Sequence, residues 1–297
     1  MFIHPSKALH QTRQYLYPYL FLLPALLVLL SILIYPLLYC FEMSFHSYSL
    51  ARGLRFIGLR NYVEIMHDPV FWKSLRVTII FSLSTVSIEL LLGLFLAIML
   101  NRKLWGRNVI RGLFLLSMLV SPIVSGIMWR FMYNADFGII NYFFEIMGFS
   151  PQVWTGDPSI ALLSCIIVDI WQYTPFVMLL LLAGLQSIPK DFYEAARVDG
   201  ATGVQQFKYI TLAMLKPMIL VVLLMRTMDS FKVFDMIYAL TGGGPGTSSL
   251  TTSIYAYYTG FRSFHLGYAS AISWILALIT IMICLIYIRS IEVPTID

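Results

Sequence analysis

Charged residues are scarce in this sequence. Asp, Glu, Lys and Arg account for 12% of its 297 residues, whereas 59% are hydrophobic. An ordinary soluble domain is about 25% charged and about 45–50% apolar. Because so little charge cannot keep a water-exposed surface dissolved, lipid must cover most of the molecule. The composition excludes a soluble globular protein and predicts a polytopic membrane protein.

Cysteine and histidine are also few. The three cysteines, Cys40, Cys165 and Cys284, lie inside apolar runs, with no Cys-x-x-Cys pair and no histidine at ligand spacing. No serine–histidine or Asp-x-x-x-Asp pattern accompanies the five histidines. We therefore expect no disulfide framework, metal site, catalytic residue or cofactor in this chain. The net charge of +5 does not indicate nucleic acid, since membrane proteins gather Lys and Arg in cytoplasmic loops.

Long apolar runs, in contrast, are abundant. About 20 residues of helix cross the roughly 30 Å of hydrocarbon in a bilayer. Six runs are long enough, at about 16–40, 75–100, 109–132, 160–185, 213–234 and 266–288. The first follows Lys7 and Arg13 as in a signal peptide, but it is too long and lacks a cleavage site, so we expect it to be retained. With no internal repeat, residues 1–297 are predicted to form one all-α transmembrane domain of six helices.

The distribution of Lys and Arg predicts the orientation of these helices. One set of alternate loops, which includes both termini, holds eleven Lys and Arg residues, and the other set holds five. The richer set faces the cytoplasm in most membrane proteins. Both termini and the segment 187–212 are therefore predicted to be cytoplasmic.

The segment 187–212 has the signals of two short helices. Pro189 suits the first turn of a helix, and Gly200 can adopt the left-handed conformation that ends one. Thr202 and Gln205 form a capping box that opens a second helix. The pattern predicts a helix, a glycine corner and another helix.

The first of these helices carries small residues among charges. Ala195 and Ala196 lie beside Glu194, Arg197 and Asp199, so the backbone of another protein could approach closely. A short amphipathic helix of this kind could equally rest on lipid headgroups. The residues alone leave both interpretations open.

The spacing in this segment resembles the EAA motif of binding-protein-dependent ABC import permeases, which reads E-A-A, three residues, G, nine residues, I, one residue, L-P. The matching residues are Glu194, Ala195, Ala196, Gly200, Ile210 and Leu212. Ala213 stands where the family has proline, and Pro217 keeps the second proline of the usual ending.

Two further segments are similar to the maltose and glycerol-3-phosphate branch of that family. They are 15–24, ahead of Tyr35 and Pro36, and 240–245, followed by Tyr255. The resemblance thus covers nearly the whole chain. The glycine-rich stretch 240–245 lacks the Gly-Lys-Ser/Thr ending of a nucleotide-binding loop.

The resemblance implies a type I ABC importer permease fold and several partners. These are a second, different permease subunit, two copies of a cytoplasmic ATPase that holds ATP and Mg, and an extracellular or periplasmic binding protein that delivers a sugar. The location implied is a prokaryotic cytoplasmic membrane. In that family the EAA loop is the coupling helix seated in the ATPase, and the resemblance assigns the coupling role to Glu194, Ala195, Ala196, Asp199 and Gly200.

Four ionisable residues lie near the midpoints of the predicted spans: Glu89, Asp169, Arg226 and Asp229. Each costs about 2.5–3.5 kcal/mol at the centre of a bilayer, so each needs a partner or a wet cavity. Arg226 could pair with Asp229 three residues on, or reach Glu89 or Asp169 across the bundle. A structural ion pair and a contact with substrate both remain open.

The fourth predicted span contains Trp171, Gln172 and Tyr173 just before Pro175. Proline removes a helical hydrogen bond, and broken helices often line transport sites. The aromatic rings could stack on sugars, and Gln172 could bind hydroxyls; a packed kink is the alternative. Three acids and one base near the midpoints disfavour an anionic substrate, so a neutral sugar is predicted.

Two other functions use the same acids differently. An ion-coupled secondary transporter would take Glu89, Asp169 or Asp229 as a proton or sodium site, and its transport would be abolished by ionophores. A membrane-embedded enzyme would use them as catalytic groups.

Overall fold

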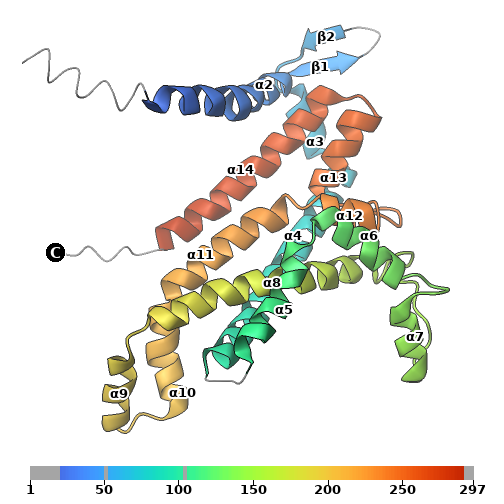
Figure 1. The fold of residues 1–297 in the computed structure, drawn as a ribbon. Coiled ribbons are helices and arrows are strands. Elements are labelled where there is room, and N and C mark those ends of the chain that lie inside the picture. Colours follow the sequence, from blue (N-terminus) through green and yellow to red (C-terminus); the bar gives the residue numbers. More distant parts are fainter. Residues whose placement is uncertain (1–20, 50–52, 103–105, 291–297) are drawn as a thin grey trace, which may run out of the picture.

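The computed structural model describes residues 21–49, 53–102 and 106–290 (Figure 1). In this part of the chain five helices are long and apolar enough to cross a membrane: Phe21–Met43, Pro69–Asn101, Ala161–Ser187, Gly203–Phe231 and Leu266–Ser290. A bent helix pair supplies a sixth span if it is counted as one. The chain is a helical polytopic membrane protein, as predicted.

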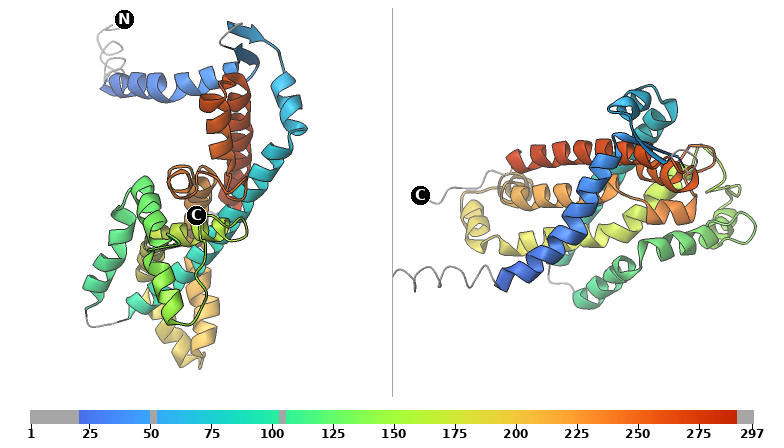
Figure 2. Two further views of the ribbon diagram at one scale, coloured as in Figure 1. Left: turned by 90° about the vertical axis from the view of Figure 1, so that its right-hand side faces the viewer. Right: turned by 90° about the horizontal axis from the view of Figure 1, so that it is seen from above.

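The first span diverges from the bundle. It contains a π-helical turn, η1 (Leu30–Ile34), followed by α2 (Tyr35–Met43). Figures 1 and 2 show α2 meeting α14 (Leu266–Ser290) at one end and running away from the other helices beyond it. None of its most apolar window is buried within the chain. Residues 16–20 of the predicted span, and both termini, lie outside the described residues.

The third predicted span, 109–132, is divided into two helices. They are α5 (Arg107–Leu119) and α6 (Pro122–Met132), and they meet at an angle of 96°. Pro122 occupies the first turn of α6, where its missing N–H is not needed, and Val120 is extended with ψ of 131°. The prediction of one unbroken helix was wrong, because a proline is favoured in the first turn of a helix and disfavoured in its interior.

Two long helices form the centre of the bundle. α4 (Pro69–Asn101) packs along α8 (Ala161–Ser187), with Gly93 of α4 so close to Val177 of α8 that a Cβ there would lie 2.6 Å from a methyl carbon. Pro175 lies inside α8, and the helix continues through it. Of the two alternatives that the sequence left open at this proline, the broken helix is therefore absent.

One end of the bundle, termed here the α9 end, carries the segment 187–212. It contains α9 (Lys190–Val198), α10 (Gly203–Gln206) and the π-helical turn η2 (Phe207–Thr211), which runs without interruption into α11 (Leu212–Phe231). Figure 1 shows α9 and α10 side by side below the bundle. The helix that contains α11 thus begins about ten residues before the predicted position of 213.

The opposite end, termed the hairpin end, holds the remaining elements. They are β1 (His46–Ser49), β2 (Gly53–Phe56), α3 (Arg60–Met66), α7 (Ile139–Ile146), α12 (Asp235–Leu240), α13 (Thr252–Tyr257) and η3 (Tyr258–Arg262). The antiparallel hairpin β1–β2 was not predicted. Gly267 of α14 lies directly against the main-chain carbonyl of His46, where a Cβ has no room.

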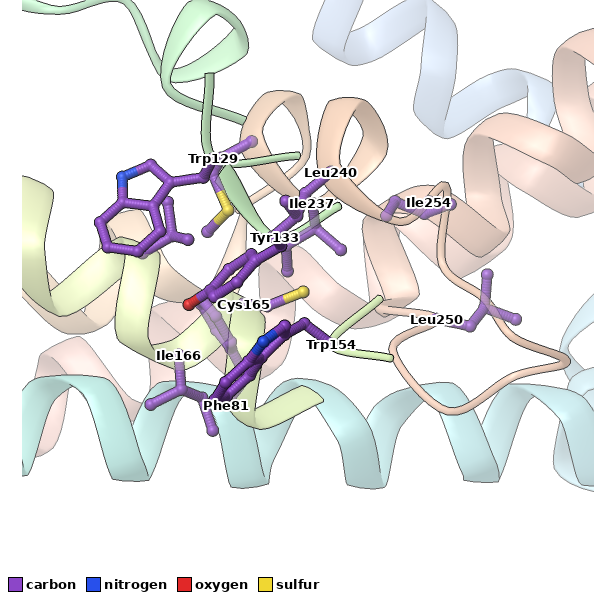
Figure 3. Close-up of a cluster of buried hydrophobic side chains, with 12 residues drawn as sticks. Phe81, Trp129, Tyr133, Trp154, Cys165, Ile166, Ile237, Leu240, Leu250 and Ile254 are labelled. Carbon is purple, nitrogen blue, oxygen red and sulfur yellow. The ribbon is translucent and has the colours of Figure 1, made fainter. Parts of the chain in front are cut away.

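An aromatic cluster fixes the segment 133–159 to the bundle (Figure 3). Tyr133 stacks on Trp154 with ring centres 5.2 Å apart, and Trp154 donates from Nε1 to Asn141 Oδ1 over 2.8 Å. Cys165 of α8 is fully buried in the same cluster and is a free thiol. This packing holds α6 and α7 to α8.

Candidate functional site

Arg226 forms a buried ionic triad with two carboxylates from other helices. Its Nε donates to Glu89 Oε2 over 2.6 Å, and its Nη2 donates to Glu89 Oε1 over 2.9 Å and to Asp169 Oδ2 over 2.8 Å. All three residues are at most 2% exposed. Asp229 pairs instead with Lys232, over 2.9 Å. Of the pairings that the sequence left open, the structure forms those between helices.

A polar stripe along α4 explains why these helices meet in this way. Its buried members recur every three or four residues: Ser74, Thr78, Ser82, Thr85 and Glu89. Thr78 Oγ1 lies 3.1 Å from Thr252 Oγ1 of α13, and the hydroxyls of Ser82 and Ser230 are hydrogen-bonded. Between helices in lipid, hydrogen bonds of this kind fix the facing surfaces. The stripe therefore directs α4 toward α11 and α13.

A cavity of about 210 Å³ adjoins the triad. Its walls include Asp169, Tyr173, Arg226, Asp229, Lys232 and Asp235. Asp169 and Tyr173 share one face of α8 because they are four residues apart. The Tyr173 ring lies over the guanidinium of Arg226, with its centre 4.0 Å from Cζ. An aromatic face and several charged groups thus border one partly open cavity.

The cavity lies nearer to the hairpin end than the sequence predicted. Asp169 is eight residues from the start of α8, and Arg226 is five residues from the end of α11. Lys232 and Asp235, which follow α11, complete the cavity, and neither was a predicted site residue. Lys232 lies at the end of the predicted run 213–234 and Asp235 just beyond it, so neither position indicated a contribution to a cavity.

Trp171 and Gln172 lie outside the lining of this cavity. Trp171 packs against Trp129 of α6, with ring centres 5.6 Å apart. Gln172 is 1% exposed and donates from Nε2 to the main-chain carbonyl of Val120. Glu89 lies behind Arg226 and does not line the cavity either. Of the predicted path residues, Asp169, Tyr173, Arg226 and Asp229 are brought together.

The segment 187–212 has the local structure that its sequence predicts. Gly200 is left-handed, with φ of +78°, and ends the turn after α9. Gln205 N–H donates to Thr202 Oγ1, while Thr202 N–H donates to Gln205 Oε1, so the capping box is complete. Tyr193 Oη lies 3.0 Å from Thr211 Oγ1 and ties α9 to η2. Ala213, which stands where the EAA motif has a proline, lies inside α11.

The surface of α9 is open to the surroundings. Glu194, Ala195, Asp199 and Gly200 are exposed, and Ala196 is half-buried. Exposed apolar side chains accompany them on α9 and α10: Phe192, Val198 and Val204, the last two 88% and 77% exposed. Apolar groups gathered on a polar helix indicate a contact surface for another molecule.

At the hairpin end, Asp68 joins three helices. It precedes α4 and accepts hydrogen bonds from the main-chain N–H of Val70, from Tyr255 Oη of α13 and from Tyr268 Oη of α14. Burial raises the pKa of Asp68, but the bonds from both tyrosines and from main-chain N–H groups together outweigh burial and hold the pKa below its ordinary value. Burial and the same bond raise the pKa of Tyr255 to about 12. The sequence analysis missed this cluster, although an Asp-Pro pair at a helix start was its signal.

Within the described residues, no three His, Cys, Asp or Glu side chains are grouped to hold a metal ion. The described residues thus form a membrane-spanning bundle with a buried ionic triad between three helices and an exposed surface on α9. The sequence model of the family described as "Binding-protein-dependent transport system inner membrane component" matches residues 89–293. The chain belongs to this family of ABC transporter permeases.

Individual relatives extend the match beyond that range. The trehalose/maltose transport system permease protein MalF of Thermococcus litoralis is 42% identical over 273 residues, which cover 91% of this chain and 92% of that protein. The trehalose transport system permease protein SugA of Mycobacterium tuberculosis is 35% identical over 269 residues, covering 90% and 85%. A bacterial ABC transporter involved in the import of the acidic polysaccharide alginate has the same fold, with a TM-score of 0.84 over 96% of this chain and 99% of that one, at 23% identity.

The chain is therefore the permease component of a binding-protein-dependent ABC importer. Members of this family are transport subunits without catalytic residues or a bound cofactor, and their mode of import requires an ATPase and a substrate-binding protein. Membership of this family excludes the two other functions considered from the sequence, an ion-coupled secondary transporter and a membrane-embedded enzyme.

Proposed function

We propose that this permease carries a sugar, delivered by an extracytoplasmic binding protein, along a path that includes the cavity beside Arg226. The cavity carries the proposal because it sets the ring of Tyr173 beside charged groups that can bind hydroxyls. Aromatic faces and polar groups together suit a sugar, which has both apolar ring faces and hydroxyls. The names of the relatives, which specify trehalose and maltose, support the same substrate class.

Coupling to the ATPase is proposed for the exposed surface formed by Glu194, Ala195, Ala196, Asp199 and Gly200. The EAA spacing supports this role, as does the exposure of Glu194, Ala195, Asp199 and Gly200, with Ala196 half-buried among them. The adjoining helix Gly203–Phe231 gives the surface a continuous connection to Arg226. Movement of α9 by an ATPase would therefore reach the wall of the cavity through a single helix.

We propose a second, different permease subunit and two ATPase copies as the remaining partners. The first span supports the second permease, because Phe21–Met43 finds almost no cover within this chain. The excess of Lys and Arg on alternate loops supports an orientation with the α9 end and both termini in the cytoplasm. The family, described as an inner membrane component, supports a prokaryotic cytoplasmic membrane.

Reversal of one charge tests the coupling assignment. Glu194→Lys in the reconstituted complex should reduce binding-protein-stimulated ATP hydrolysis and uptake by about tenfold, within the range of typical coupling free energies. Lys208→Glu is the matched control, because it reverses a charge in η2 outside the proposed surface. Normal stimulation and uptake in Glu194→Lys would show that this surface does not couple.

A second experiment tests the substrate path. Tyr173→Ala should lower uptake of a disaccharide such as trehalose while stimulated ATP hydrolysis continues, because the ATPase surface is untouched. Trp171→Ala is the comparison, since Trp171 packs on Trp129 outside the cavity. Equal uptake by Tyr173→Ala and the wild type would exclude the cavity from the path.

A further inference from the structure

We propose that Glu89 and Asp169 set the charge selectivity of the cavity by occupying Arg226, so that neutral sugars enter and acidic sugars are rejected. The inference rests on the proposed path through this cavity. It assigns to Glu89, which does not line the cavity, a positioning role that acts through Arg226.

The first step concerns the donors of Arg226. A free guanidinium binds a carboxylate through two parallel N–H bonds, the strongest arrangement for an acidic ligand. Here Nε and one N–H of Nη2 serve Glu89, and the other N–H of Nη2 serves Asp169. Only Nη1 is left outside these bonds, so neither two-atom edge of the guanidinium is available to a ligand.

The second step concerns the face of Arg226. Tyr173 covers it with its ring centre 4.0 Å from Cζ. A ligand in the cavity therefore meets the tyrosine ring on this side of the cation. Such a surface suits the apolar face of a neutral sugar better than a carboxylate.

The third step is the balance of charge around the cavity. Two carboxylates, Glu89 and Asp169, share one guanidinium, and Lys232 is already paired with Asp229. Asp235 adds a further exposed acid to the wall. An acidic sugar would lose part of its hydration beside an excess of negative charge, and both the lost hydration and the like charges oppose its binding.

A purely structural role for the triad predicts a different outcome. If the triad only joins α4, α8 and α11, its loss should weaken the binding of every ligand alike. Charge selectivity, in contrast, appears in the ratio between two ligands that differ only in charge. This ratio is the decisive readout.

Methyl glucoside and methyl glucuronide are such a pair, because a carboxylate replaces one hydroxymethyl group. Their direct binding to the purified complex in nanodiscs, without the binding protein, can be followed by saturation-transfer NMR. Glu89→Gln and Asp169→Asn each remove one acid and leave Arg226 a single charged partner, so at least one variant should assemble. Each should raise the glucuronide-to-glucoside affinity ratio about tenfold, because one unit charge near the ligand is removed at an effective dielectric of about 20.

Two controls separate charge from shape. Glu89→Asp keeps the negative charge and should keep the wild-type ratio. Thr85→Val changes another buried polar residue on the same stripe of α4 and should leave the ratio unchanged, since Thr85 bonds only within α4.

An unchanged ratio in both Glu89→Gln and Asp169→Asn would overturn the inference while leaving the path intact. The path itself would be rejected if Tyr173→Ala bound both ligands as tightly as the wild type. That outcome would overturn the proposed function and, with it, this inference.

Discussion

Gln172 donates a hydrogen bond of 2.8 Å from Nε2 to the main-chain carbonyl of Val120. Val120 follows the last residue of α5, at the sharp bend before α6. A buried side chain of the central helix α8 thus supplies a donor to the backbone where the third span is broken. Backbone acceptors cannot stay unpaired in a dry interior, so this bond stabilises the bend.

Removal of this donor should loosen the bend. Gln172→Ala is expected to destabilise the folded protein by about 1 kcal/mol, the usual size of a hydrogen bond between membrane helices. A lower midpoint of thermal unfolding in nanodiscs would show it. Gln186→Ala is the matched control, because Gln186 is an exposed glutamine on the same helix. Equal midpoints for the two variants would contradict the assignment.

Two glycines should respond in opposite ways to alanine. A Cβ on Gly126 of α6 would lie 2.5 Å from the carbonyl oxygen of Met236 and 2.8 Å from Cβ of Ala239 in α12. Gly126→Ala should therefore force α6 from α12 and cost about 1–3 kcal/mol. Gly112 of α5 has nothing within 4 Å, so Gly112→Ala should be neutral or gain up to about 1 kcal/mol from helix propensity. Thermal unfolding of the two variants measures both effects, and an equal loss of stability in the two would contradict this packing.

Asp68 should make the hairpin end sensitive to acid. Its pKa is held below the ordinary value, so its contribution is complete above the unfolded pKa of about 3.9 and is lost as pH falls through the folded pKa. Asp68→Asn should therefore lower the unfolding midpoint at pH 7, and the difference from wild type should shrink below about pH 4. Asp136→Asn, at an exposed acid of the same end, should show little difference at either pH. A constant difference across pH would argue against this role.

Cysteine labelling tests the proposed orientation. In a background without the three native cysteines, Ser263→Cys should react with an impermeant maleimide added to spheroplasts, and Val204→Cys should not. Both positions are exposed in the structure and lie at opposite ends of the bundle. Ser249, in an otherwise suitable loop, is fully buried and would give no signal. Labelling of Val204→Cys alone would invert the orientation.

The local signals in the sequence were sufficient where neighbouring residues decide the structure. The corner at Gly200 and the capping box of Thr202 and Gln205 depend on backbone geometry and on bonds across three residues. Both could be predicted because no distant contact competes with them. Five of the six predicted spans followed in the same way from the length of each apolar run, and the third is divided between α5 and α6.

Contacts between distant residues were harder to predict. The sequence named Arg226 and three candidate partners, but only the packing of α4, α8 and α11 selects Glu89 and Asp169 over the nearer Asp229. Pro122 and Pro175 show the same limit, because one divides a span and the other lies inside a continuous helix. A proline in the first turn of a helix removes no hydrogen bond from that helix. Pro175 does remove one, and the surroundings of α8 accommodate this loss.

The π-helical turn at Phe207–Thr211 affects how the helix that contains it tolerates changes in length. Its hydrogen bonds enclose one residue more than those of an α-helical turn. Deletion of one residue within this turn would restore α-helical geometry and leave Thr202 and Arg226 on their present faces. Deletion of one residue between Leu212 and Arg226 would instead rotate one end against the other by about 100°. Length changes in this helix are thus tolerable at the α9 end and disruptive near the triad.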